Sequence, residues 1–155
     1  LELSVEDVLE YGNVDLIWAS PPCTHYSCAR TYAKTPRDLE GSDTLVAKLL
    51  DLADELYYYF MIENPYSVLL KTRPVVQGIN MEDLDYCRYG TAYRKRTAIW
   101  TNSEWSPQRP LCNKDCASSD GKRHTRSAQR AGPGWHHSLE EVYAIPPELC
   151  EEIAE

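Results

Sequence analysis

A cysteine that follows two prolines is the first residue of this chain with an evident chemical use. Cys23 stands in the stretch WASPPCTHYS, residues 18–27, where Pro21 and Pro22 separate a hydrophobic run from a polar one. A thiolate is a nucleophile, and prolines stiffen the backbone that presents it. The alternative is that Cys23 is a small buried hydrophobic residue. Its neighbours in the fold must decide between the two.

A second group of residues has the types and spacing of a metal site. The segment LCNKDCASSDGKRH places two cysteines four apart and a histidine eight residues further on. These residues are Cys112, Cys116 and His124. Tetrahedral zinc accepts thiolate and imidazole ligands at such spacing, but it needs a fourth ligand from elsewhere. The candidates are Cys87 first, then His136 or His137. The alternative is a loop with two unrelated thiols.

Two predicted strands and a helix position Cys23. The apolar run at 14–20 stops at the two prolines, which is typical of a buried strand. Leucines at spacings of four, three and four predict a helix from about 43 to 56, and an aromatic strand at 57–62 follows. Strand, helix and strand form a unit with parallel strands. Cys23 and Glu63 should therefore lie at the same sheet edge, where α/β proteins bind ligands.

The rest of the chain completes an α/β domain. Residues 83–89 and 97–101 are predicted to form a strand pair. Residues 103–137 are rich in Pro, Gly, Ser and basic side chains, so a loop region is expected there. Ser138 and Glu141 have the spacing of a helix capping box, and a last helix is expected after the prolines at 146–147. We expect one domain over residues 1–155, with 103–137 as a basic insertion within it.

Three strings resemble, in order and spacing, catalytic motifs of the DNA (cytosine-5-)-methyltransferases. They are DLIWASPPC, IENP about 40 residues later, and YRKRTAIWTN beyond it. Phage and virus members carry similar strings, and HSLEEVYAIP is a weaker fourth likeness. The ENPY string is also similar to one in amino-group methyltransferases, but that interpretation leaves Cys23 unexplained. The resemblance covers nearly the whole chain and implies a Rossmann-like fold.

The resemblance implies a role for each motif residue. Cys23 would add as a thiolate to C6 of a cytosine flipped out of DNA. Glu63, in a protonated state, would form hydrogen bonds to N3 and to the exocyclic amine of the cytosine. Arg94 and Arg96 would stabilise the charge that develops on the thiolate and the base. The methyl group would come from S-adenosylmethionine. Ala92 stands where the family carries glutamine, so one polar contact differs.

The resemblance also assigns a cofactor site, but an incomplete one. A strand end at 3–8 would carry Asp7 and Val8, and Pro22 would line the cofactor. The glycine-rich turn of the family is missing, so we expect an incomplete methyltransferase sheet, very weak S-adenosylmethionine binding and an inactive or weakly active isolated chain. The strand at 14–20 would lose a neighbour, so we expect it to pair with a second copy or with the chain's own N-terminus.

The charge pattern agrees with a DNA partner. The net charge is −8, yet residues 88–137 hold ten Lys and Arg against three acids, while the remaining 105 residues hold six bases and 21 acids. A basic segment on an acidic body can face a polyanion, although a solvated loop gives the same count. The rival to an enzyme is a non-catalytic nucleic-acid-binding or assembly remnant of a methyltransferase.

The cysteine count and the lack of long apolar runs exclude other classes. Six unevenly spaced cysteines predict reduced thiols rather than a disulfide scaffold, with Cys28 and Cys150 structural. No stretch approaches the roughly 18 apolar residues of a membrane span, and an acidic N-terminus is unlike a signal peptide. We therefore expect a cytoplasmic protein encoded by a bacterium, phage or virus.

Overall fold

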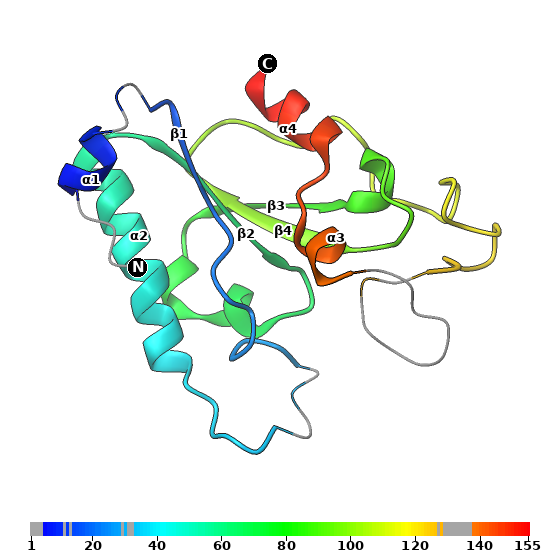
Figure 1. Ribbon diagram of the computed structural model, residues 1–155, viewed down its shortest axis with the longest axis horizontal. Coiled ribbons are helices and arrows are strands. Elements are labelled where there is room, and N and C mark those ends of the chain that lie inside the picture. Colours follow the sequence, from blue (N-terminus) through cyan, green and yellow to red (C-terminus); the bar gives the residue numbers. More distant parts are fainter. Residues whose placement is uncertain are drawn as a thin grey trace. The chain divides into compact units, whose positions relative to one another are not determined.

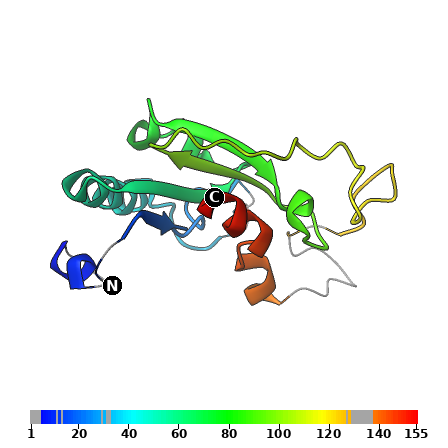
Figure 2. The same ribbon diagram turned by 90° about the horizontal axis from the view of Figure 1, so that it is seen from above.

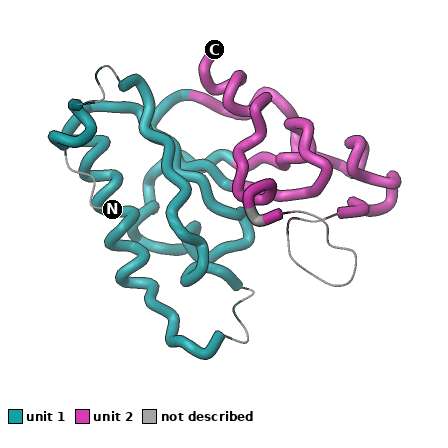
Figure 3. The backbone as a smooth tube through the Cα atoms, in the orientation of Figure 1, with its two compact units in different colours: residues 1–82, 98–104 teal, residues 83–97, 105–155 magenta. Residues whose placement is uncertain are grey.

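The computed structural model divides the chain into two compact units. It describes residues 5–10, 12, 14–28, 30, 33–126, 128 and 138–155. Unit 1 comprises residues 1–82 with 98–104, and unit 2 comprises residues 83–97 with 105–155 (Figure 3). The single domain with an insertion at 103–137 stays a prediction.

Four strands form a sheet in the described part of the chain. They are β1 (Leu16–Ala19), β2 (Tyr59–Pro65), β3 (Asn80–Asp85) and β4 (Arg96–Thr101), in the order β1-β2-β4-β3. β1 and β2 lie side by side in both views of the ribbon and are parallel, with Ala19 opposite Ile62 (Figures 1 and 2). The predicted parallel pair is therefore confirmed, within a mixed α/β structure that is compatible with a methyltransferase.

Helix α2 (Leu39–Leu56) connects the two parallel strands and begins earlier than predicted. Asp38 caps it, because its Oδ1 accepts a hydrogen bond of 2.8 Å from the backbone N–H of Gly41. Tyr57 ends the helix in a left-handed conformation with φ +57°. β2 then continues to Pro65, so the prediction that the strand stops before Glu63 is wrong.

The hydrophobic core of unit 1 lies between α2 and one face of the sheet. Val46 and Ala53 of α2 belong to the same buried cluster as Phe60 and Ile62 of β2. Side chains alternate along a strand, so Glu63 faces the other side of β2. The carboxyl group of Glu63 is thus separated from the apolar cluster by the sheet.

Helix α1 (Val5–Glu10) corrects the prediction of a strand end at 3–8. Glu6 and Asp7 lie in its first turn, where negative charge is favourable beside the helix N-terminus. Val8 is buried. The described part of the N-terminal segment therefore supplies no strand to the sheet.

β1 lies at an edge of the described sheet, with β2 as its neighbour. All four of its residues are half-buried. The expectation that the chain's own N-terminus pairs with this strand is wrong for residues 5–10, which are helical. Pairing with a second copy stays a prediction.

Short helices complete the chain. Two 3-10 helices, Leu69–Thr72 and Pro74–Val76, follow β2, and a third, Tyr86–Tyr89, follows β3 where strand was predicted. The capping box at Ser138 and Glu141 is confirmed in front of α3 (Leu139–Tyr143), and α4 (Pro147–Ala154) follows it. Within the described ranges, every helix is too short or too polar to cross a membrane.

Candidate active site

Cys23 begins a tight turn four residues after the end of β1. Its carbonyl oxygen accepts a hydrogen bond of 2.8 Å from the backbone N–H of Ser27, which closes the turn. The side chain is half-buried and packs against the core cluster of unit 1. The thiol thus lies at the carboxyl end of β1, less exposed than the sequence suggested.

Asn64 joins the turn at Cys23 to the second motif. Its Nδ2 donates a hydrogen bond of 2.9 Å to the carbonyl oxygen of Pro21, and its side chain is 1% exposed. Glu63, the preceding residue, is also buried, at 6% exposed. The structure therefore places Cys23 and Glu63 at the same edge of the parallel strand pair. Sequence reasoning gave Asn64 no role, although it stands inside the IENP string.

Tyr26 anchors the same turn to helix α2. Its hydroxyl donates a hydrogen bond of 2.9 Å to Asp43 Oδ1 on α2, and Arg73 donates two to Asp43 Oδ2, at 2.8 and 2.6 Å. The carbonyl oxygen of Tyr26 accepts from the backbone N–H of Leu69 at 2.9 Å. Burial, helped by the bond to Asp43, raises the pKa of Tyr26 well above its ordinary value. The turn that carries Cys23 is thus fixed on two sides.

Replacing Tyr26 by phenylalanine should lower the free energy of unfolding by about 1 kcal/mol, because it removes one buried hydrogen bond while Asp43 keeps Arg73. In a chain of this size the melting temperature should fall by roughly 2–4 °C. Urea unfolding followed by circular dichroism measures the change. Tyr57→Phe is the matched control, because Tyr57 is 94% exposed. Equal effects of both substitutions would contradict the anchoring role of Tyr26.

An apolar pocket of about 220 Å³ lies beside the active-site turn. The end of β1, from Ala19 to Pro21, forms one wall, and Leu45, Val46 and Leu49 of α2 form another. The predicted cofactor residue Pro22 directly follows this wall in the chain. The pocket can take an apolar part of a ligand close to Cys23.

The two other predicted cofactor residues lie on α1. The side chain of Asp7 is exposed, whereas Val8 is buried, at 5% exposed. Pro22, the third predicted cofactor residue, is exposed just before the turn at Cys23. Asp7 and Pro22 therefore present accessible side chains, and Val8 is a buried residue of the helix. Their cofactor contacts stay predictions.

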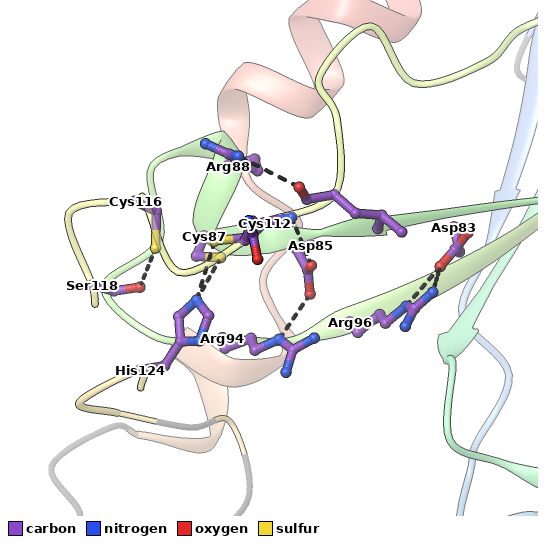
Figure 4. A network of polar contacts seen from close by, with 12 residues as sticks. Asp83, Asp85, Cys87, Arg88, Arg94, Arg96, Cys112, Cys116, Ser118 and His124 are labelled. Atoms are coloured by element: carbon purple, nitrogen blue, oxygen red, sulfur yellow. Dashed lines mark hydrogen bonds and ion pairs between the residues drawn. The ribbon is translucent and has the colours of Figure 1, made fainter. Parts of the chain in front are cut away.

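The paired arginines of the third motif belong to unit 2. Arg94 Nε lies 3.2 Å from Asp85 Oδ1, and Arg96 Nε donates to Asp83 Oδ2 at 2.7 Å (Figure 4). Asp85 is 1% exposed, while the Arg94 side chain is 43% exposed. Two carboxylates on one strand thus hold the two guanidinium groups in place. The alternating DLD string of residues 83–85 was the sequence signal for this pairing, and it was missed.

Four side chains of unit 2 converge as the predicted metal site requires. Their ligand atoms all lie within 4.8 Å of one another: Cys87, Cys112, Cys116 and His124. His124 Nε2 lies 3.6 Å from Cys87 Sγ and 3.2 Å from Cys112 Sγ (Figure 4). The structure therefore favours the first candidate for the fourth ligand. The alternatives, His136 and His137, lie outside the described residues.

The surroundings of Cys87, Cys116 and His124 shift the pKa values of their side chains in different directions. Burial, with hydrogen bonds to Cys112 and Cys116, raises the pKa of the Cys87 thiol. Burial opposes ionisation of Cys116 too, but the bonds from Ser118 and from the other thiols outweigh it and lower the pKa. Burial and then the charge of Arg94 lower the pKa of His124, which favours neutral imidazole. A neutral imidazole is the form that binds metals.

Several basic side chains of the 88–137 segment are neutralised locally. Arg88 pairs with Asp115 at 2.7 Å, Arg109 pairs with Glu148, and the two motif arginines pair with β3. Most of these acids lie outside the segment whose charge was counted. Among the described residues of the segment that the structure leaves exposed are Lys114, Lys122, Arg123 and Arg126. The basic surface is therefore smaller than the sequence count indicated.

The four-stranded sheet is compatible with a methyltransferase fold, and one known protein, a probable methyltransferase, is similar to this chain in sequence. A probable DNA (cytosine-5)-methyltransferase of Frog virus 3 (isolate Goorha) is 29% identical in an alignment that covers 95% of this chain and 81% of the relative. No protein-family model matches. The resemblance predicted from the three strings is confirmed: over nearly its whole length the chain is similar to a viral protein that is a probable DNA (cytosine-5)-methyltransferase.

Proposed function

We propose that the chain carries out the covalent chemistry of cytosine-5 methylation in DNA, with Cys23 as the nucleophile. The observation that carries the proposal is the position of Cys23 and Glu63 at one edge of the β1–β2 pair, joined by the bond from Asn64 to Pro21. A thiol and a buried carboxyl group at the carboxyl ends of two neighbouring parallel strands are the two kinds of group that this chemistry needs, at the end of the sheet where α/β proteins bind ligands.

Each residue has a defined task in this reaction. The thiolate of Cys23 forms a bond to C6 of cytosine, which makes C5 nucleophilic. Glu63 donates a proton at N3 and accepts a hydrogen bond from the exocyclic amine. Arg94 and Arg96, held by Asp85 and Asp83, supply positive charge that stabilises the adduct.

S-adenosylmethionine would supply an electrophilic methyl group when bound, and the structure fits it only in part. Asp7 and Pro22 are accessible, but the pocket beside Pro21 measures about 220 Å³, whereas pockets for whole ligands span roughly 300–1,000 Å³. The described residues would thus hold a part of the cofactor. This supports the expectation that the isolated chain binds it weakly.

DNA is the substrate that the relationship to DNA methyltransferases suggests. The target base must leave the DNA duplex before a thiol can reach C6. Contacts from the protein to the DNA phosphates must therefore hold the DNA strand in place. Lys122, Arg123 and Arg126 are exposed around one hairpin of unit 2 and can supply such contacts.

Covalent trapping tests the proposal. Cytosine that carries fluorine at C5 cannot lose a proton from C5 after methylation, so the enzyme stays bound to the base. With saturating S-adenosylmethionine we expect a denaturation-resistant complex with 5-fluorocytosine DNA, attached at the peptide that contains Cys23. A chain that shifts DNA in native gels but never forms this complex would support the non-catalytic remnant instead.

A further inference from the structure

We propose that Cys87, Cys112, Cys116 and His124 bind one structural zinc ion, which holds residues 111–126 in place beside Arg94. The proposal goes beyond cytosine chemistry, because none of these four side chains takes part in it. It rests first on geometry. The four ligand atoms lie within 4.8 Å of one another and come from three separate places in the sequence.

The distances fit tetrahedral coordination. With Zn–S near 2.3 Å and Zn–N near 2.0–2.1 Å, neighbouring ligand atoms lie about 3.6–3.8 Å apart. His124 Nε2 lies 3.6 Å from Cys87 Sγ and 3.2 Å from Cys112 Sγ. Both separations are close to the tetrahedral value, and every pair of ligand atoms lies within 4.8 Å.

The local backbone is built to present these ligands. Between Cys112 and Cys116 the chain turns sharply, with Lys114 in the left-handed region at φ +66°. The hairpin before His124 is closed by Asp120, whose Oδ1 accepts the backbone N–H groups of Lys122 and Arg123 at 2.8 Å each. Two tight turns therefore direct the ligands to one point.

Outer contacts complete the arrangement. Ser118 is 7% exposed, and its Oγ lies 3.1 Å from Cys116 Sγ, as expected for a hydroxyl that bonds a metal-bound thiolate. Three thiolates, a neutral imidazole and Zn²⁺ carry one net negative charge. Arg88 follows Cys87 directly in the chain and pairs with Asp115, which lies between Cys112 and Cys116, at 2.7 Å.

A disulfide explains the cluster less well. It would join two of the three thiols and leave the third thiol and His124 with no role. The ring of His124 points at the sulfurs of Cys87 and Cys112 (Figure 4), and a histidine has no function in a disulfide. Tetrahedral ligand sets of sulfur and nitrogen are typical of zinc and of iron–sulfur centres, and a mononuclear site with one histidine is a common form for zinc.

The metal site is connected directly to the arginine motif. The backbone N–H of Cys112 donates to Asp85 Oδ2 at 3.1 Å, and Asp85 Oδ1 pairs with Arg94 Nε at 3.2 Å. The backbone of Arg94 bonds the other end of the loop, through Arg126 O at 3.2 Å and the N–H of Ala128 at 3.1 Å. Zinc that fixes the loop therefore fixes both sides of Arg94.

Native mass spectrometry of the full chain, purified under reducing conditions, tests the site. We expect about one zinc ion per chain in the wild type and its loss in Cys112→Ser. Cys150→Ser is the matched control, because Cys150 is an exposed free cysteine outside the cluster, and it should retain the metal.

Two further measurements keep the test decisive if Cys112→Ser does not fold. Cobalt added to the metal-stripped wild type should give the absorption bands of a tetrahedral thiolate complex. Removing zinc should also speed amide hydrogen exchange around Arg94 and leave the exchange of β2 unchanged. A wild-type chain without zinc and without those cobalt bands, or a disulfide among these cysteines after reduction, would overturn the proposal, as would unchanged exchange at Arg94.

Discussion

Replacing Cys23 by serine is expected to abolish tritium release from DNA that carries [5-³H]cytosine. In the proposed reaction the thiolate adds to C6, C5 takes a proton from water, and elimination of the thiolate releases tritium from C5. This exchange needs no methyl donor, so it tests the nucleophile independently of cofactor binding. The rate should fall by about 10³-fold or more, since the covalent step depends on the thiol. Scintillation counting of the released water measures it.

The matched control for Cys23→Ser is the substitution of a second cysteine in the same stretch of the chain. Cys28 is exposed and follows Cys23 by five residues, so Cys28→Ser should keep the wild-type rate. Retained exchange in Cys23→Ser would show that the half-buried thiol is a packing residue, as the alternative interpretation of the sequence held. Absence of exchange in the wild type, with DNA still bound, would instead support the remnant.

The location of the candidate active-site edge could be predicted because local patterns determine it. An apolar run that ends at two prolines, a leucine face and an aromatic run are enough to specify parallel strands, and Cys23 and Glu63 follow the paired parts of these strands. The first and last residues of the helices and strands were harder to predict. Helix α2 starts at Leu39 because Asp38 caps it, and a single side chain of this kind has little weight in a periodic pattern.

The residues that the sequence missed act over long separations. Asn64 bonds a carbonyl oxygen 43 residues away, and Arg73 reaches Asp43 across 30 residues. Nothing in the local sequence distinguishes such a residue from a solvated polar one. The Cys and His cluster was different, because cysteine and histidine have few other uses in a reduced chain, so Cys87 could be chosen as a member from its type alone.

Replacing Glu63 by glutamine is the second change with a large expected effect. Glutamine has nearly the shape of the carboxyl group and can still hydrogen-bond the base, but it cannot transfer a proton to N3. Tritium release should fall by about 10²–10⁴-fold, the usual contribution of an acid or base catalyst. Affinity for DNA, measured by fluorescence anisotropy, should change little, because the side chain is 6% exposed and far too buried to contact phosphates.

Glu55→Gln on α2 provides the matched control, since Glu55 is exposed and the substitution removes the same charge. It should react like the wild type. If Glu63→Gln also kept the wild-type rate while remaining folded, the carboxyl group would have only a structural role at the end of β2. If both rate and DNA affinity fell together with the melting temperature, the loss would reflect unfolding. A loss of rate alone assigns Glu63 to the chemistry, because packing on the far side of β2 from the apolar cluster requires no proton transfer.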